Sequence, residues 1–254
     1  MFGSRTHNQA QFERVAEKTY TWRSSEQKFF CYDKENGERV PLPDDAKLIP
    51  LTSTNAVTGV HSLDMGRATE RHNPVFSNEF TDYKNEVIRV REHDRLDGTT
   101  TVLFEGVYSP TVRDAIASVP YCKFTKNIYC LLDGEVVKLE LKASSLKPWI
   151  DFEDSLRKTK TYLTDGHCVT IGESQKCKMG TVIYYAPTFE LGDITPEENS
   201  KADEIAVEVE DKLARNRAAR SGDNEMPAQI QPIAEKTAEP EDVPQEISLD
   251  EVPF

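Results

Sequence analysis

Aromatic and lysine side chains alternate in several short segments of the sequence. The clearest segment is 121–126, others lie at 22–34 and 157–162, and the run 136–142 places two lysines on one side of a strand. An aromatic ring can stack on a flat ring of a ligand, and an ammonium group can pair with an anionic oxygen such as that of a phosphate. The candidate binding residues in these segments are Trp22, Lys28, Phe30, Tyr32, Tyr121, Lys123, Phe124, Lys126, Lys138, Lys142, Lys158 and Lys160.

The same alternation is also typical of ordinary strands, in which the ring fills the core and the neighbouring lysine faces water. Each segment therefore has two interpretations. The strongest candidates for ligand contact are the segment 121–126 and the hairpin that carries Phe30 and Tyr32. We expect Trp149 and Phe189 to be core residues instead.

Catalysis finds little support in the sequence. It contains no glycine-rich phosphate loop, no His-Glu-x-x-His and no Gly-x-Ser-x-Gly. The stretch 92–97 has the acidic residues of a metal-dependent nuclease, but its composition is more typical of a polar turn. His167 and Cys168, followed by Cys177, could form half of a zinc site, whereas small hydrophobic residues in strands explain the same cysteines. We therefore expect a binding protein without a cofactor or metal.

The final segment, 248–254, joins two carboxylates to an apolar end. Pro253 cannot donate a ladder hydrogen bond, so a core strand has no use for this arrangement. As a peptide ligand, the segment offers an aromatic ring for a pocket and carboxylates for basic residues. The candidate partner-binding residues are Asp250, Glu251, Val252, Pro253 and Phe254.

Charge is unevenly distributed along the 254 residues, whose formal net charge is −13. From Asp193 onward, 17 acidic residues against 6 basic residues give −11, and the other 27 acidic and 25 basic residues give −2. The body is therefore close to neutral, and the low isoelectric point belongs to the tail. Such a body does not strongly repel nucleic acid, but its composition lacks the basic excess of a strong phosphate binder.

Targeting and redox signals indicate a cytoplasmic protein. No apolar run approaches the ~18 residues that a membrane-spanning helix needs, and residues 1–5 lack the apolar core of a signal peptide. The five cysteines are irregularly spaced and include no Cys-x-x-Cys pair. We therefore expect reduced thiols in a cytoplasm.

Three regions differ in composition: a body over 1–192, a capped helix over 193–222 and an acidic tail over 223–254. The tail has 9 acidic residues, one basic residue and no apolar periodicity, so we expect it to be a disordered tether. In the helical region, Thr195, Pro196 and Glu198 form a capping-box pattern. Its narrow apolar stripe should pack on the body or on another copy of the chain, and consists of Ala202, Ile205, Ala206, Val209 and Leu213.

Strands are expected to dominate the body from about 21 to 191. Asn36-Gly37 and Asp133-Gly134 predict two hairpins. A third strand pair is predicted between 169–171 and 181–185, joined by a polar loop over 172–180. Strands are also expected over 86–91 and over 99–108, where 102, 104 and 106 should share one side.

Short helices are predicted at 9–18, after the Ser109 cap, and over 145–157. Strands with a short helix between hairpins favour a mainly β (α+β) fold. We expect a small Greek-key barrel of the OB type, enlarged by insertions, with a C-terminal helix and the acidic tail.

The terminal Asp-Glu-Val-Pro-Phe resembles the acidic tip of bacterial and phage single-stranded DNA-binding proteins. The order of β-rich body, capped helix and acidic tail is similar to that of the phage type. The resemblance implies an OB fold and coating of single strands, without strong sequence preference, during phage replication, recombination or repair. It also implies that the tip recruits replication or recombination proteins. Two alternatives stay open: a protein-binding adaptor that does not bind DNA, and a metal-dependent nuclease.

Overall fold

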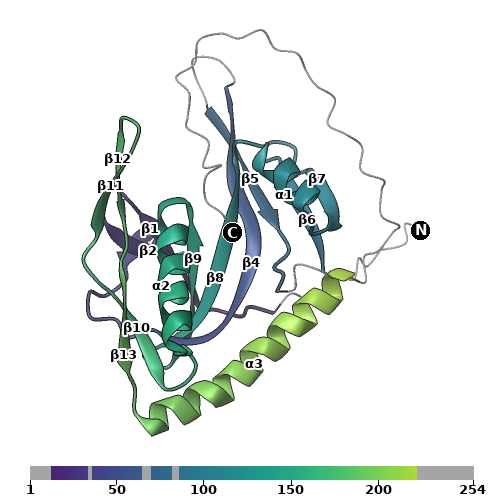
Figure 1. The fold of residues 1–254 in the computed structure, drawn as a ribbon. Coiled ribbons are helices and arrows are strands. Elements are labelled where there is room, and N and C mark those ends of the chain that lie inside the picture. Colours follow the sequence, from purple (N-terminus) through teal and green to yellow (C-terminus); the bar gives the residue numbers. More distant parts are fainter. Residues whose placement is uncertain (1–12, 34–35, 65–69, 82–85, 222–254) are drawn as a thin grey trace.

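A computed structural model of the chain describes residues 13–33, 36–64, 70–81 and 86–221 (Figure 1). The described strands are β1 (Lys18–Arg23), β2 (Lys28–Asp33), β3 (Glu38–Pro41), β4 (Ile49–Asp64), β5 (Glu70–Ser77), β6 (Val87–His93), β7 (Thr100–Val107), β8 (Cys122–Leu132), β9 (Glu135–Lys142), β10 (His167–Ile171), β11 (Gln175–Met179), β12 (Val182–Ala186) and β13 (Phe189–Asp193). The helices are α1 (Pro110–Ala117), α2 (Leu146–Thr159) and α3 (Pro196–Ser221), with a 3-10 turn η1 (Ala143–Ser145).

Among the described residues, nine strands form one sheet in the order β3-β2-β1-β9-β8-β4-β5-β6-β7. Its pairs are antiparallel except for β1, which runs parallel to β9. Two further pairs, β10 with β13 and β11 with β12, form separate two-stranded sheets. The fold is therefore mainly β, as predicted. The described strands close no barrel, since β3 and β7 remain the two edges of the sheet.

Both glycine-containing turns form the predicted hairpins. β2 pairs with β3 around Gly37, and β8 pairs with β9 around Asp133 and Gly134. Asp133 and Gly134 have φ values of 51° and 87°, which a two-residue turn between twisted strands requires. Sequence-local turn chemistry is sufficient to specify these two pairs.

The third predicted pair is wrong. The segment 172–180 contains the strand β11 rather than a loop, and β11 pairs with β12. β10 pairs with β13, so residues 169–171 lie opposite 189–191 instead of 181–185. Polar residues alternate with Cys177 and Met179 in β11, and only the latter two are half-buried. This exposed strand therefore lacks the hydrophobic signal that a core strand shows.

The prediction that 102, 104 and 106 share one side of the sheet is wrong, because a β-bulge interrupts the pairing. Phe104 lies opposite Val90, but Val102 lies opposite Arg91, because the register shifts between Val90 and Arg91. Val102 consequently points to the other side of the sheet from Phe104. The extra residue of a β-bulge reverses the alternation, which periodicity alone does not reveal.

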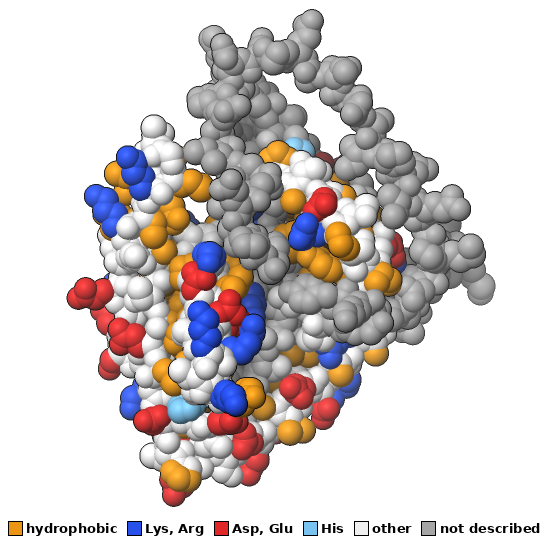
Figure 2. Space-filling model, in the orientation of Figure 1, with side chains coloured by type: hydrophobic (Ala, Val, Ile, Leu, Met, Phe, Trp, Pro, Cys, Tyr) orange, Lys and Arg blue, Asp and Glu red, His pale blue; other side chains and the backbone are white. Residues whose placement is uncertain are grey.

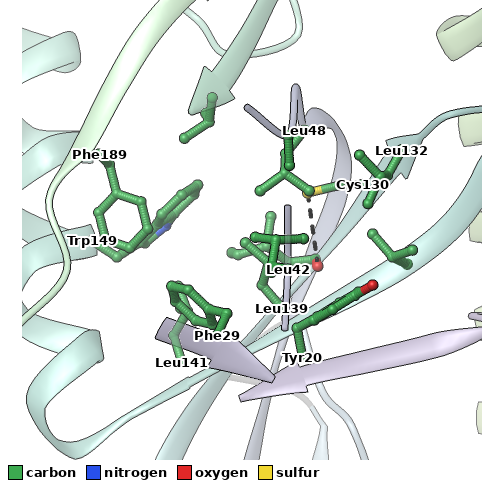
Figure 3. Close-up of a cluster of buried hydrophobic side chains, with 14 of the residues drawn as sticks. Tyr20, Phe29, Leu42, Leu48, Cys130, Leu132, Leu139, Leu141, Trp149 and Phe189 are labelled. Atoms are coloured by element: carbon green, nitrogen blue, oxygen red, sulfur yellow. Dashed lines mark hydrogen bonds between the residues drawn. The ribbon is translucent and has the colours of Figure 1, made fainter. Parts of the chain in front are cut away.

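One face of the sheet is covered by α1 and α2. Trp149 of α2 packs on Phe29, Leu139 and Leu141 of the central strands, together with Phe189 (Figure 3). α1 covers the neighbouring part of the same face over β4, β5 and β6. Trp149 is 1% exposed and Phe189 is 9% exposed, which confirms both as core residues.

α3 packs on the opposite face, at the end of the sheet where β4 begins. Its buried stripe of Ala202, Val209 and Leu213 contacts Ile49 and Leu131. The prediction that this stripe packs on the body is confirmed. At the start of the helix, Thr195 N donates to Glu198 Oε2 at 2.8 Å and Glu198 N donates to Thr195 Oγ1 at 3.2 Å, which confirms the capping box.

The segment that precedes β1 is not the predicted helix. Residues 13–17 are not helical, Lys18 already belongs to β1, and residues 1–12 lie outside the described part. Glu13 instead holds the far end of α3, because both its carboxylate oxygens accept from Arg215, at 2.8 and 2.9 Å. In the described part of the chain, no helix has the length and apolar character needed to cross a bilayer.

Candidate nucleic-acid interface

The side of the sheet that faces away from α1 and α2 is named the open face. Strand register assigns side chains to it, since residues directly opposite each other point to the same side. One row runs Phe30–Thr21–Glu140, and continues from Glu140 to Asn127 and Thr54. A second row, four residues earlier in β8, runs Lys123–Thr58–Phe76–Arg91. α3 packs on this face near Ile49, Leu131 and Tyr129. Towards its C-terminal end, α3 also lines a cavity together with Thr54 and Lys138.

Basic side chains dominate the open face. Over β3, β2, β1, β9, β8 and residues 49–58 of β4, Glu140 is the single acidic residue that the described register places there. The six basic residues on the same strands and side are Arg23, Lys28, Arg39, Lys123, Lys138 and Lys142.

Carboxylates neutralise part of this charge. Lys28 Nζ lies 2.8 Å from Asp44 Oδ1, and Lys142 Nζ lies 2.6 Å from Glu140 Oε1. The other pairs join Lys138 to Glu79 at 3.4 Å, and both Arg23 (3.4 Å) and Arg39 (3.9 Å) to Glu26. Lys123 is exposed and has no carboxylate partner among the described residues.

Two aromatic groups flank these cations. Tyr32 is 63% exposed, while Phe30, two residues before it in β2, is half-buried. Across β1, β9, β8 and β4 lies Phe76 of β5, which is 40% exposed. Five strand spacings separate β2 from β5, or about 24 Å on an untwisted sheet. Phe76 is absent from the sequence-based candidates, because Pro74 argues against a strand at this point.

The polar floor between the rings is held by side-chain hydrogen bonds. Thr54, Thr125 and Asn127 are each 1–2% exposed. Thr58 Oγ1 lies 2.7 Å from Thr125 Oγ1, and Asn127 Nδ2 donates to Thr54 Oγ1 at 3.5 Å. Asn127 Oδ1 is buried and has no hydrogen-bond partner among the described residues.

Glu79 connects this floor to a cavity of about 240 Å³ beside α3. One carboxylate oxygen, Oε2, accepts from Thr54 Oγ1 at 2.6 Å and from the Tyr129 hydroxyl at 2.7 Å. The other, Oε1, lies 3.4 Å from Lys138 Nζ. A loop carboxylate therefore holds three strands together and neutralises one cation of the open face.

The structure divides the segment 121–126 between two faces. Lys123 lies on the open face, but Lys126 points to the helical side, where Nζ donates to both carboxylate oxygens of Glu153 at 2.8 and 2.6 Å. Phe124 packs in the core under α1. Tyr121 stacks on His61 with ring centroids 4.1 Å apart, and burial raises the pKa of the Tyr121 hydroxyl. The sequence segment is continuous, but its side chains do not form one surface.

The remaining candidates lie away from the open face. Trp22 packs edge-on against Phe29 in the core and donates from Nε1 to the backbone oxygen of Tyr185 at 2.9 Å. Lys158 and Lys160 lie at the C-terminal end of α2, which covers the opposite side of the sheet. Register thus brings together Lys28, Phe30, Tyr32, Lys123, Lys138 and Lys142, and places Trp22, Tyr121, Phe124, Lys126, Lys158 and Lys160 elsewhere.

The acidic stretch 92–97 has structural contacts. Glu92 Oε1 lies 3.0 Å from His61 Nδ1 and accepts from Asn73 Nδ2 at 2.8 Å. Asp94 Oδ1 accepts from the backbone of its own turn. In the described ranges, no three His, Cys, Asp or Glu side chains are grouped so that they could hold a metal ion. The candidate tip residues 250–254 lie outside the described residues.

Comparison with known proteins adds no family to this geometry. No protein-family model, curated protein or solved structure matches the chain.

Proposed function

We propose that the protein binds single-stranded DNA across its open face. The carrying observation is the ratio of six basic residues to one acidic residue on that side of β3, β2, β1, β9, β8 and residues 49–58 of β4, in a body whose net charge is −2. Exposed rings at both flanks, Tyr32 and Phe76, complete the combination of cations and stacking surfaces that single strands need.

Phosphates would exchange with the carboxylates that now pair with the cations. The pairs formed by Lys28, Arg23 and Arg39 are solvent-exposed, and such pairs contribute only ~0–1 kcal/mol each. A phosphate can therefore replace Asp44 or Glu26 at little cost. Stacking on Tyr32 and Phe76 accepts any base, so the proposal includes binding with little sequence preference.

The biological role proposed is coating of single strands during phage DNA replication, recombination or repair. The more specific OB-type Greek key stays a prediction, because nine strands here form an open sheet in the described residues. The tail over 223–254 is proposed to recruit replication or recombination proteins through its tip and to compete with DNA for the basic face. Deleting 223–254 should leave DNA affinity equal or higher, and loss of DNA binding on deletion would contradict this role for the tail.

Charge reversal at Lys123 tests the proposed face. Each phosphate contact on a single strand contributes a slope of about 0.7 in log K against log salt, which corresponds to about eightfold in affinity between 1 M and about 50 mM salt. Lys123→Glu should therefore weaken oligo-dT binding by at least about eightfold at low salt and reduce the salt slope by about 0.7.

The matched control is Lys201→Glu. Lys201 is also exposed and has no carboxylate partner among the described residues, but it lies on α3 beside Gly134, at the opposite end of β8. This variant should reduce the slope much less than Lys123→Glu. Equal losses in both variants would show that only net charge matters, and would contradict a DNA site on the open face. A wild-type chain that binds no DNA but captures an acidic protein through Lys123 would favour the adaptor alternative.

A further inference from the structure

A two-stranded ribbon, formed by β11 and β12, projects from the sheet beside the β1–β2 turn (Figure 1). Its base is bonded to that turn, because Tyr185 N donates to Ser24 Oγ at 2.7 Å and Trp22 Nε1 donates to Tyr185 O at 2.9 Å. The turn joins Arg23 to Lys28, which lie opposite each other on the open face. The ribbon therefore begins where the basic surface of the sheet ends.

One side of the ribbon combines lysines with apolar side chains. Lys176 lies opposite Tyr185 and Lys178 lies opposite Ile183, so all four side chains point to the same side. Lysine and hydrophobic side chains lie together on this projection in Figure 2. Ile183 is 55% exposed, and Val182 at the tip is 54% exposed.

The charge of the ribbon differs from that of the whole chain. Its sequence has no carboxylate between Glu173 and Glu190, although the chain carries a net charge of −13. Neither Lys176 nor Lys178 has a carboxylate partner among the described residues. A polyanion is the ligand class that complements two lysines without counter-charges.

The exposed apolar residues narrow the choice of polyanion. A duplex hides its bases in the stack, so phosphate contacts alone would explain the lysines but not Ile183. A single strand offers both phosphates and the faces of unstacked bases. The side that carries Ile183 and Tyr185 has the two kinds of contact that such a strand requires.

We propose that the ribbon is a second contact for the single strand as it leaves the open face at Arg23 and Lys28. Lys176 and Lys178 bind successive phosphates, and Ile183 and Tyr185 pack against bases. The ribbon thereby lengthens the binding site beyond the sheet. This inference rests on the proposed function, since it concerns the same DNA strand.

The test uses the full-length chain and labelled oligo-dT of increasing length. Lys176→Gln combined with Lys178→Gln removes two charges and keeps a polar, unbranched side chain at each position. For long oligonucleotides, the salt slope should fall by about 1.4, and affinity at about 200 mM salt should fall about tenfold. For the shortest oligonucleotides that bind, which the open face holds alone, affinity should stay within about twofold of wild type.

Two further variants separate charge from packing. The control pair Lys201→Gln and Lys212→Gln on α3 changes net charge equally, and should leave the length dependence unchanged. Ile183→Thr retains a β-branched residue. It should weaken the binding of long oligonucleotides without changing the salt slope.

The outcomes distinguish this inference from the function on which it rests. Unchanged affinity and slope at every length in the Lys176/Lys178 variant, with wild-type DNA binding intact, would overturn the ribbon contact alone and would leave protein docking as its use. No DNA binding by the wild-type chain at any length would overturn both. Thermal unfolding of each variant must match wild type, so that loss of binding is not loss of fold.

Discussion

Replacing Glu79 should destabilise the fold and at the same time free Lys138 for the proposed DNA contact. The side chain accepts hydrogen bonds from Thr54 and Tyr129, whose residues are 1% and 3% exposed. In Glu79→Ala both hydroxyls lose their acceptor. Glu79→Gln retains one acceptor oxygen but removes the charge that pairs with Lys138.

The expected loss in the free energy of unfolding follows from these contacts. A hydrogen bond to a charged group contributes ~1.5–3 kcal/mol, and a buried donor left unpaired costs ~1–3 kcal/mol. In Glu79→Ala, Thr54 Oγ1 still accepts from Asn127 Nδ2 at 3.5 Å, so this oxygen loses only the bond that it donates. Glu79→Ala should therefore cost about 3 kcal/mol, and Glu79→Gln about 1 kcal/mol. For a chain of this size, 3 kcal/mol corresponds to a fall in Tm of roughly 6–12 °C.

Urea unfolding followed by circular dichroism measures the loss of stability in each Glu79 variant. Tyr129→Phe is the second substitution, because Tyr129 donates to Glu79. In a double-mutant cycle, Glu79→Ala and Tyr129→Phe should couple by about 1 kcal/mol or more. DNA binding should strengthen although stability falls. Glu79→Gln releases Lys138, so the slope of log K against log salt should become steeper by about 0.7. Free energies of unfolding within about 0.5 kcal/mol of wild type for both Glu79 variants would refute the assigned contacts.

The remaining predictions concern single contacts elsewhere in the fold. Gly59→Ala should destabilise the fold by more than about 3 kcal/mol in a thermal-unfolding assay, because its Cβ would lie 1.8 Å from a backbone carbonyl oxygen. The control is Gly106→Ala, whose Cβ would meet its nearest atom at 3.8 Å and which should be tolerated. Thr195→Ala should lower stability by about 1 kcal/mol through loss of the α3 cap, and an unchanged urea midpoint would contradict the capping box. Iodoacetamide should alkylate Cys177 first, since the other cysteines are buried and burial raises the pKa of Cys122 to about 11; mass spectrometry that finds a buried cysteine modified first would contradict the described burial.

Local signals in the sequence predicted those hairpins and helix ends whose structure depends on neighbouring residues alone. Asn36-Gly37 and Asp133-Gly134 defined hairpins, Ser109 and Thr195 marked helix starts, and the stripe of α3 indicated a packed face. Each of these depends on residues within a few positions of one another. The predicted mainly β fold follows from the same signals.

Long-range pairing could not be predicted in the same way. The pairing of β1 with β9 and of β4 with β8 joins residues more than sixty positions apart, and it alone shows which side of β8 faces the core. A period of two places Lys123 and Lys126 on opposite sides, but it does not reveal which side is open. Phe76 was missed because Pro74 interrupts its strand signal, and Lys176 because β11 has no buried face.

Single-strand binding by the open face is tested most directly by fluorescence anisotropy of labelled oligo-dT, titrated with the full-length chain over a series of salt concentrations. A labelled ligand is needed because Trp22 and Trp149 both pack in the core and should report poorly on the open face. Six cations, partly neutralised by carboxylates, predict saturable binding with a slope of log K against log salt between about −2 and −4. No rise in anisotropy at low salt, or binding that salt does not weaken, would contradict the proposed function.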